Sequence, residues 1–105
     1  MSYSYVNWRD AVLRGIYIRQ VLANYALLLN GATKIQPRNS KTVRMFVMNN
    51  SLTPIYVGAD ENVHASNGFP LLPYDVMVFQ FIPELVSVSV YLYGEGQEVR
   101  VLEVW

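Results

Sequence analysis

The chain has 105 residues with 52% hydrophobic residues, only 15% charged residues and a formal net charge of zero. This length corresponds to one domain, and so few charges cover its apolar surface poorly, which favours an oligomer or an assembly component. The absence of cysteine excludes disulfides and cysteine-based zinc sites. The apolar runs are too short to span a bilayer and the start is not that of a signal peptide, so we expect no membrane partner.

The charges are divided between the two halves of the sequence. Up to Arg44 seven basic residues stand against Asp10 alone, and beyond it seven acidic residues stand against Arg100 alone. One interpretation is that basic strands pair with acidic strands inside one sheet. The other is that subunits meet basic face to acidic face, because complementary potentials select partners.

Residues 1–14 are predicted to form an N-terminal arm or a short helix, ahead of a β domain over residues 15–105. Within residues 5–13, Trp8 and Val12 would share one helical face. Because the segment is short, an extended arm is the alternative.

Strands and turns dominate from Gly15 onward. The apolar run over residues 25–29 stops at Asn30-Gly31, a strong turn dipeptide. Residues 41–49 alternate, which predicts a strand with Val43, Met45 and Val47 on its apolar face.

The second half predicts a short strand at residues 55–57, closed by Gly58, and a sheet edge at Pro70, which cannot donate a ladder hydrogen bond. Three further strands, at residues 75–82, 85–93 and 98–105, are predicted to form an antiparallel meander. Gly94-Glu95-Gly96 would be the tight turn between the last two. About seven strands with frequent turns predict an all-β fold, a single antiparallel β-sandwich or small barrel.

Turn chemistry stands out in residues 49–58 (Asn-Asn-Ser-Leu-Thr-Pro-Ile-Tyr-Val-Gly) and 66–71 (Ser-Asn-Gly-Phe-Pro-Leu). Asn and Ser can hydrogen-bond back to the backbone. Gly58 and Gly68 would supply positive φ, and Phe69 would plug the end of the sandwich.

These two segments, with residues 99–103, resemble a small β-sandwich module of tailed phages and related viruses, found in head decoration, head fibre and tail-associated proteins. The resemblance covers residues 42–103 and implies a virion component that self-associates or binds the capsid. The chain departs from the module at Tyr74-Asp75, where a Gly-Glu turn is usual, and the bulky Tyr74 indicates a contact surface particular to this protein.

Catalytic patterns are lacking in the sequence, so we expect no enzyme and no cofactor. His64 is the only histidine, and a metal site would need Asp60 and Glu61 beside it. Asp60-Glu61-Asn62 lacks the calcium-loop pattern. A solvated loop histidine is the simpler interpretation.

Aromatic residues interleaved with arginines near the start are typical of protein interfaces and also of single-stranded nucleic-acid binding. We expect the interface and no nucleic-acid partner. The candidate interface residues are Tyr3, Tyr5, Trp8, Arg9, Arg14, Tyr17, Arg19, Tyr74, Tyr91, Tyr93 and Trp105.

Taken together, the sequence predicts a non-enzymatic virion structural protein, a small decoration or minor capsid protein. It would assemble with itself, as a trimer by analogy, and with the major capsid or other virion proteins. One alternative is a tail or fibre component that binds carbohydrate or a receptor through Tyr74, Tyr91 and Tyr93. A further alternative is a single-stranded nucleic-acid-binding protein.

Overall fold

The computed structural model describes residues 20–80 and 90–105, and within them the fold is all-β and antiparallel, as predicted. The possible helix at residues 5–13 and the start of the strand predicted at 85–93 lie outside the described residues. The six described strands are β1 (Val21–Ile35), β2 (Arg44–Asn49), β3 (Ile55–Gly58), β4 (Phe69–Leu71), β5 (Val76–Gln80) and β6 (Val90–Val104).

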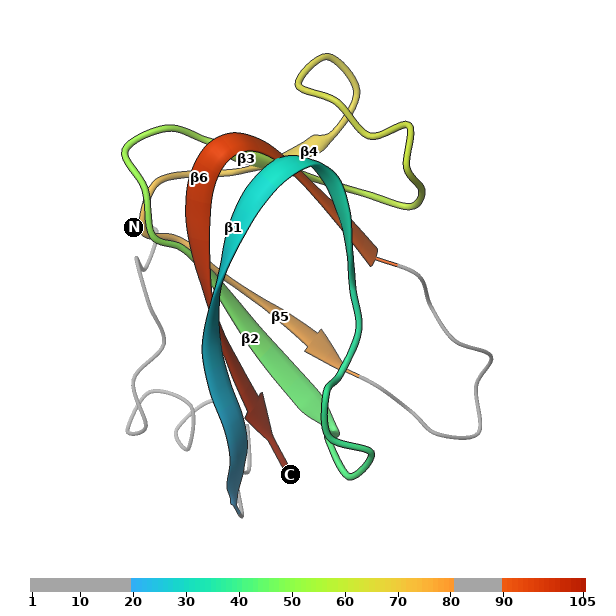
Figure 1. Cartoon of the computed structure of the whole chain (residues 1–105), viewed down its shortest axis with the longest axis vertical. Helices are drawn as coiled ribbons and strands as arrows, with labels where there is room; N and C mark the ends of the chain where they lie inside the picture. The colour runs from blue at the N-terminus through green and yellow to red at the C-terminus, as the bar shows by residue number, and fades with distance from the viewer. Residues whose placement is uncertain (1–19, 81–89) are drawn as a thin grey trace.

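All six strands belong to one curled sheet in the order β4-β3-β6-β2-β5, with β1 paired along β6 on its other side. The long strand β6 has two different neighbours on one edge: residues 91–93 pair with β3, and residues 99–104 pair with β2. The sheet therefore has an upper half, containing β3 and β4, and a lower half, containing β2 and β5. The β1–β6 ribbon arches from one half into the other (Figure 1).

The ribbon bends where Gly31 lies directly opposite Gly94. Gly31 and Gly96 have φ values of 87° and 93°, which side chains with a Cβ rarely adopt. A register shift beside them leaves Gly96 and Gln97 opposite Leu29, which is a β-bulge. The predicted turns at 30–31 and 94–96 are therefore wrong: the glycines turn a sheet corner within continuous strands.

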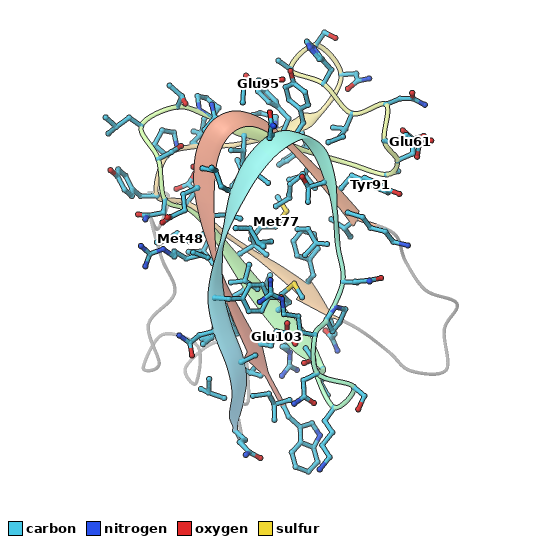
Figure 2. The ribbon with its side chains drawn as sticks, viewed as in Figure 1. Met48, Glu61, Met77, Tyr91, Glu95 and Glu103 are labelled. Carbon is cyan, nitrogen blue, oxygen red and sulfur yellow. The ribbon has the colours of Figure 1, made fainter. Side chains whose placement is uncertain are left out.

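The core lies between the two halves. Met45, Val47, Val99 and Val101 face inward from the lower half, and Ile55, Leu71, Val90 and Leu92 from the upper half. Leu29 fills the inside of the bend and is fully buried. In Figure 2, Met77 lies among the side chains enclosed below the arch, while Glu95 lies on its outside. Strands that pass between facing halves through bends and bulges are a known way to close a small β domain.

One further prediction is wrong, and another is met only at the level of whole strands. The last strands do not form a meander, because β5 pairs with β2 and not with β6. Strands of the basic half do pair with strands of the acidic half, β1 with β6 and β2 with β5 and β6. In the described ladders, however, no oppositely charged residues lie directly opposite each other: Lys34 lies opposite Tyr91, and Arg44 lies opposite Gln80 and Val104. The ion pair between Glu98 and Arg100 lies within β6.

Other predictions are confirmed. Met45 and Val47 are buried on β2, although this strand begins at Arg44, one residue after the half-buried Val43. The short strand at residues 55–57 is present as β3. Pro70 lies on the edge strand β4, where its missing N–H breaks no ladder bond.

Candidate interaction surface

Asn49, at the end of β2, organises one corner of the molecule. Its fully buried side chain donates from Nδ2 to the carbonyls of Thr53 and Leu71, both at 2.9 Å, and accepts a 2.6 Å bond from Ser51 Oγ. Its main chain accepts from Tyr74 N–H (2.7 Å) and donates to the Asp75 carbonyl (3.1 Å). One amide therefore fastens the turn after β2 to the segment between β4 and β5, and these two segments run side by side in Figure 1.

Large apolar side chains are exposed at this corner. Leu52 is 81% exposed, Leu72 is 51% and Tyr74 is 43%, and Phe69, further along β4, is 68% exposed. The backbone next to Leu52 and the backbone next to Leu72 come together, because the carbonyls of Thr53 and Leu71 accept bonds from the same amide nitrogen. We call Leu52, Phe69, Leu72 and Tyr74 the apolar edge. Large exposed apolar side chains on a rigid support are typical of a binding surface.

Tyr74 has a φ of 64°. Within the described residues it is the one non-glycine residue with positive φ. A bulky residue in this region stores strain of about 1–3 kcal/mol, and such strain persists where the surroundings over-determine it. Here the Tyr74 N–H bond to Asn49 and the Asp75 N–H bond to the Leu72 carbonyl hold the turn. The turn thus holds Tyr74 in a fixed conformation, and its role as a contact surface stays a prediction.

Acidic residues lie beside the apolar edge. Asp75 follows Tyr74, and Glu98 is bound through its main chain and side chain by Asn50, two residues before Leu52. The Asn50 amide and then the Arg100 guanidinium hold the pKa of Glu98 below its usual value. Glu95 is joined through Gln97 to Thr53, next to Leu52. Only the main chain of Glu95 takes part in that link, because its carboxylate accepts a bond from Tyr93. The acidic residues beside the edge are therefore Asp75 and Glu98, with Glu98 in an ion pair with Arg100.

The loop at residues 59–68 packs back against β3. A Cβ added to Gly58 would lie 2.5 Å from Val63 Cβ, and one added to Gly68 would lie 2.6 Å from Tyr56 Cβ. Neither Gly58 nor Gly68 has positive φ, so the prediction that they supply positive φ is wrong. Glycine is needed at these positions because Val63 and Tyr56 pack too closely for a Cβ to fit. Phe69 is also not the predicted core plug, because it is exposed, and the buried apolar residue of this loop is Val63.

A second surface is formed by tyrosines on the outer side of the upper half. Tyr56 lies directly opposite Tyr93, and Tyr91 lies opposite Gly58, so all three tyrosines belong to the same face. The His64 ring stacks on Tyr93 at 4.6 Å between centroids. The Tyr93 hydroxyl donates to Glu95 at 2.7 Å, and this bond raises the pKa of Tyr93.

Glu103 is the most elaborately bonded polar group in the described chain. Its fully buried carboxylate accepts bonds from the Tyr25 hydroxyl (2.5 Å), the Thr42 hydroxyl (2.7 Å) and the N–H groups of Arg38 and Asn39 (2.9–3.0 Å). The Arg38 guanidinium lies 3.6 Å above the Tyr25 ring. This cluster ties the C-terminal strand β6 to the loop between β1 and β2.

The cluster shifts two titrations in opposite directions. Burial is the largest single influence on Glu103 and acts to raise its pKa, but the bonds from Tyr25, Arg38, Thr42 and Asn39 together outweigh it, so the pKa is lowered. Burial, and then the bond to Glu103, raises the pKa of Tyr25. At neutral pH the pair is therefore a carboxylate and a phenol.

Acidification is expected to remove the stability that Glu103 contributes. Its folded-state pKa lies below the unfolded value of about 4.3, so between these two values the unfolded chain binds more protons than the folded one. The contribution is present above about pH 4.3 and is lost as the pH falls through the folded pKa. Urea unfolding of the wild type and Glu103→Gln should show a stability difference that shrinks on acidification, and a pH-independent difference would contradict the assignment.

The predicted interface residues have different outcomes. Tyr3, Tyr5, Trp8, Arg9, Arg14, Tyr17 and Arg19 lie outside the described residues. Tyr74 belongs to the apolar edge, and Tyr91 and Tyr93 belong to the tyrosine face. Trp105 is 43% exposed, and its main chain exchanges two bonds with Gln20, at 2.9 and 3.0 Å.

Sequence reasoning missed Leu52, Phe69 and Leu72 as surface residues. A usable signal was Leu52 itself, an apolar residue inside the polar turn Asn-Asn-Ser-Leu-Thr-Pro. Leu72 lies between Leu71 and Pro73 and carried no such signal, because two consecutive apolar residues are also typical of a buried strand.

Within residues 20–80 and 90–105, no three His, Asp or Glu side chains come together as a metal site, so Asp60, Glu61 and His64 are not brought together as one. Every buried polar side-chain atom described has a hydrogen-bond partner. In the same part of the chain no helix has the length and apolar character to cross a membrane.

Comparisons with models of protein families, with curated proteins and with solved structures find no match.

Proposed function

We propose that the chain is a non-enzymatic structural protein of a virus particle, a small capsid-associated protein that binds copies of itself and neighbouring virion proteins. The observation that carries the proposal is the apolar edge, with exposed Leu52, Leu72 and Tyr74 held in place by the buried Asn49. Asn49, Ser51 and Thr53 belong to a turn segment that resembles the phage module, and their hydrogen bonds stabilise this corner. The apolar side chains of the corner stay exposed.

The use of polar groups in the described chain also supports an assembly role over a catalytic one. Glu103 and Asn49, the most strongly bonded buried polar groups, each join segments distant in sequence. A catalytic acid or base has to be within reach of a substrate, whereas these side chains are fully enclosed. Large apolar and aromatic side chains are also exposed at the surface, among them Leu52, Leu72 and Tyr74, and such residues are typical of the core of a protein interface.

Self-association is the direct test. Size-exclusion chromatography with light scattering should give a mass that is a multiple of the 12.0 kDa chain, with a trimer as the expected species. A trimer, or another closed oligomer, supports the proposal. A monomer over the accessible concentration range, together with no binding to assembled particles in co-sedimentation, would contradict it. Labelling the protein in images of intact particles then distinguishes a head from a tail location.

The tyrosine face favours one second candidate, a carbohydrate-binding component of a tail or fibre. Tyr56, Tyr91 and Tyr93 lie together on one sheet face, and aromatic rings provide flat apolar surfaces against which sugar rings can pack. A glycan array, with Tyr91→Ala as the matched variant, tests it: binding that Tyr91→Ala abolishes would favour this candidate, and no binding by the wild type would remove it.

A further inference from the structure

We propose that the apolar edge of one copy is the docking site for residues 1–19 of a second copy. The inference rests on the proposed self-association and assigns its two contacting parts. The receiving surface is Leu52, Leu72 and Tyr74, with Phe69 further along β4. The occupant is the aromatic and basic N-terminal segment.

The receiving surface is suited to side-chain anchors and not to strand addition. β4 is an edge strand of only three residues and contains Pro70, which cannot donate to an added strand. Leu52, Leu72 and Tyr74 instead offer an apolar surface whose backbone is fixed by the bonds of Asn49. A rigid receiving surface keeps the entropic cost of binding low.

Charge complementarity identifies the occupant. Asp75 and Glu98 lie beside the apolar edge, with Glu98 in an ion pair with Arg100, whereas the Glu95 carboxylate bonds to Tyr93 on the tyrosine face. Residues 1–19 carry three arginines against one aspartate, together with three tyrosines and a tryptophan. Aromatic and arginine side chains are the usual anchors of interfaces, and their charge is opposite to that of the border.

The length of the segment allows it to reach a neighbouring copy. Gln20, to which residues 1–19 are covalently joined, is bound to Trp105 just before β1. Nineteen residues could span at most about 68 Å if fully extended, whereas the longest dimension of the molecule is 36 Å. A segment that can extend past its own domain and whose chemistry complements an exposed surface can link adjacent subunits.

Cysteine cross-linking tests the contact directly, because the full-length chain has no cysteine of its own. Trp8→Cys and Leu72→Cys chains are mixed, oxidised and run on a non-reducing gel, and we expect a disulfide-linked dimer containing one chain of each kind. The control mixes Trp8→Cys with Ser40→Cys, an exposed position in the loop between β1 and β2, and should give much less dimer. Equal yields in the two mixtures would overturn the proposal. So would cross-linking confined within single chains of a Trp8→Cys/Leu72→Cys variant.

Surface substitutions provide the second measurement. Leu52→Ser and Leu72→Ser should each weaken self-association about tenfold, while urea unfolding changes little because both side chains are exposed. Leu28→Ser is the matched control, since Leu28 is 72% exposed on β1 but outside the apolar edge, and it should assemble like the wild type.

The outcomes separate this inference from the proposed function. If the wild type assembles and Leu52→Ser/Leu72→Ser assembles equally well, the docking site is wrong and self-association stands. If the wild type is monomeric and no Trp8→Cys/Leu72→Cys dimer forms, both fail. Raising the salt concentration should weaken assembly in part, because the charged border is screened and the apolar contacts are not.

Discussion

Glu103→Gln is expected to lower the free energy of unfolding by about 3 kcal/mol, because the carboxylate is fully buried and accepts bonds from four residues. Glutamine has nearly the same shape, so packing is conserved. Its amide nitrogen, however, is a donor, and it would face the hydroxyl and N–H donors that now point at a carboxylate oxygen. Chemical denaturation with urea at neutral pH measures the effect.

The control for Glu103→Gln is Glu98→Gln, on the same strand. Glu98 makes a 2.8 Å bond with Asn50 and a 2.6 Å ion pair with Arg100, but it lies at the surface. Surface ion pairs contribute little to stability, so this variant should unfold close to the wild type. If the two variants were equally stable, the Glu103 cluster would not stabilise the contact between β6 and the loop after β1.

Gly58→Ala is expected to destabilise the fold by about 2–3 kcal/mol through overpacking. The new methyl group would lie 2.5 Å from Cβ and Cγ2 of Val63, a side chain that is almost completely buried. The position of the Val63 Cβ is fixed by the backbone, so no change of rotamer can remove it from the contact. Thermal unfolding and urea titration should both show the loss.

Two comparisons make the Gly58 result specific. Gly31→Ala tests backbone strain without crowding, since Gly31 has φ of 87° and open space around it, and it should cost about 1–2 kcal/mol. In a Val63→Gly background the clash is gone, so adding Gly58→Ala should cost little, and a double-mutant cycle measures that coupling. A Gly58→Ala cost unchanged by Val63→Gly would show that the close contact is not its cause.

The apolar edge illustrates where sequence reasoning reaches its limit. Tyr74 could be singled out because a bulky residue stood in a turn, and its φ of 64° agrees with that. Phe69 and Leu72 could not be singled out from the sequence. Whether an apolar residue in or beside a strand is buried depends on which other segments of the fold cover it. Phe69 lies on β4 at the edge of the sheet and is exposed there, while Leu71, two residues later, is buried.

The sequence by itself determined the all-β class, the alternating faces of β2 and the edge position of Pro70, because period-two patterning and proline chemistry are local properties. Only the tertiary structure decided the role of the glycines. Gly31 and Gly94 read locally as hairpin turns, yet they pair with each other and turn a corner between the two halves of the sheet. That choice depends on which strands lie opposite each other, and pairing between β1 and β6 joins residues about seventy positions apart, which no local pattern encodes.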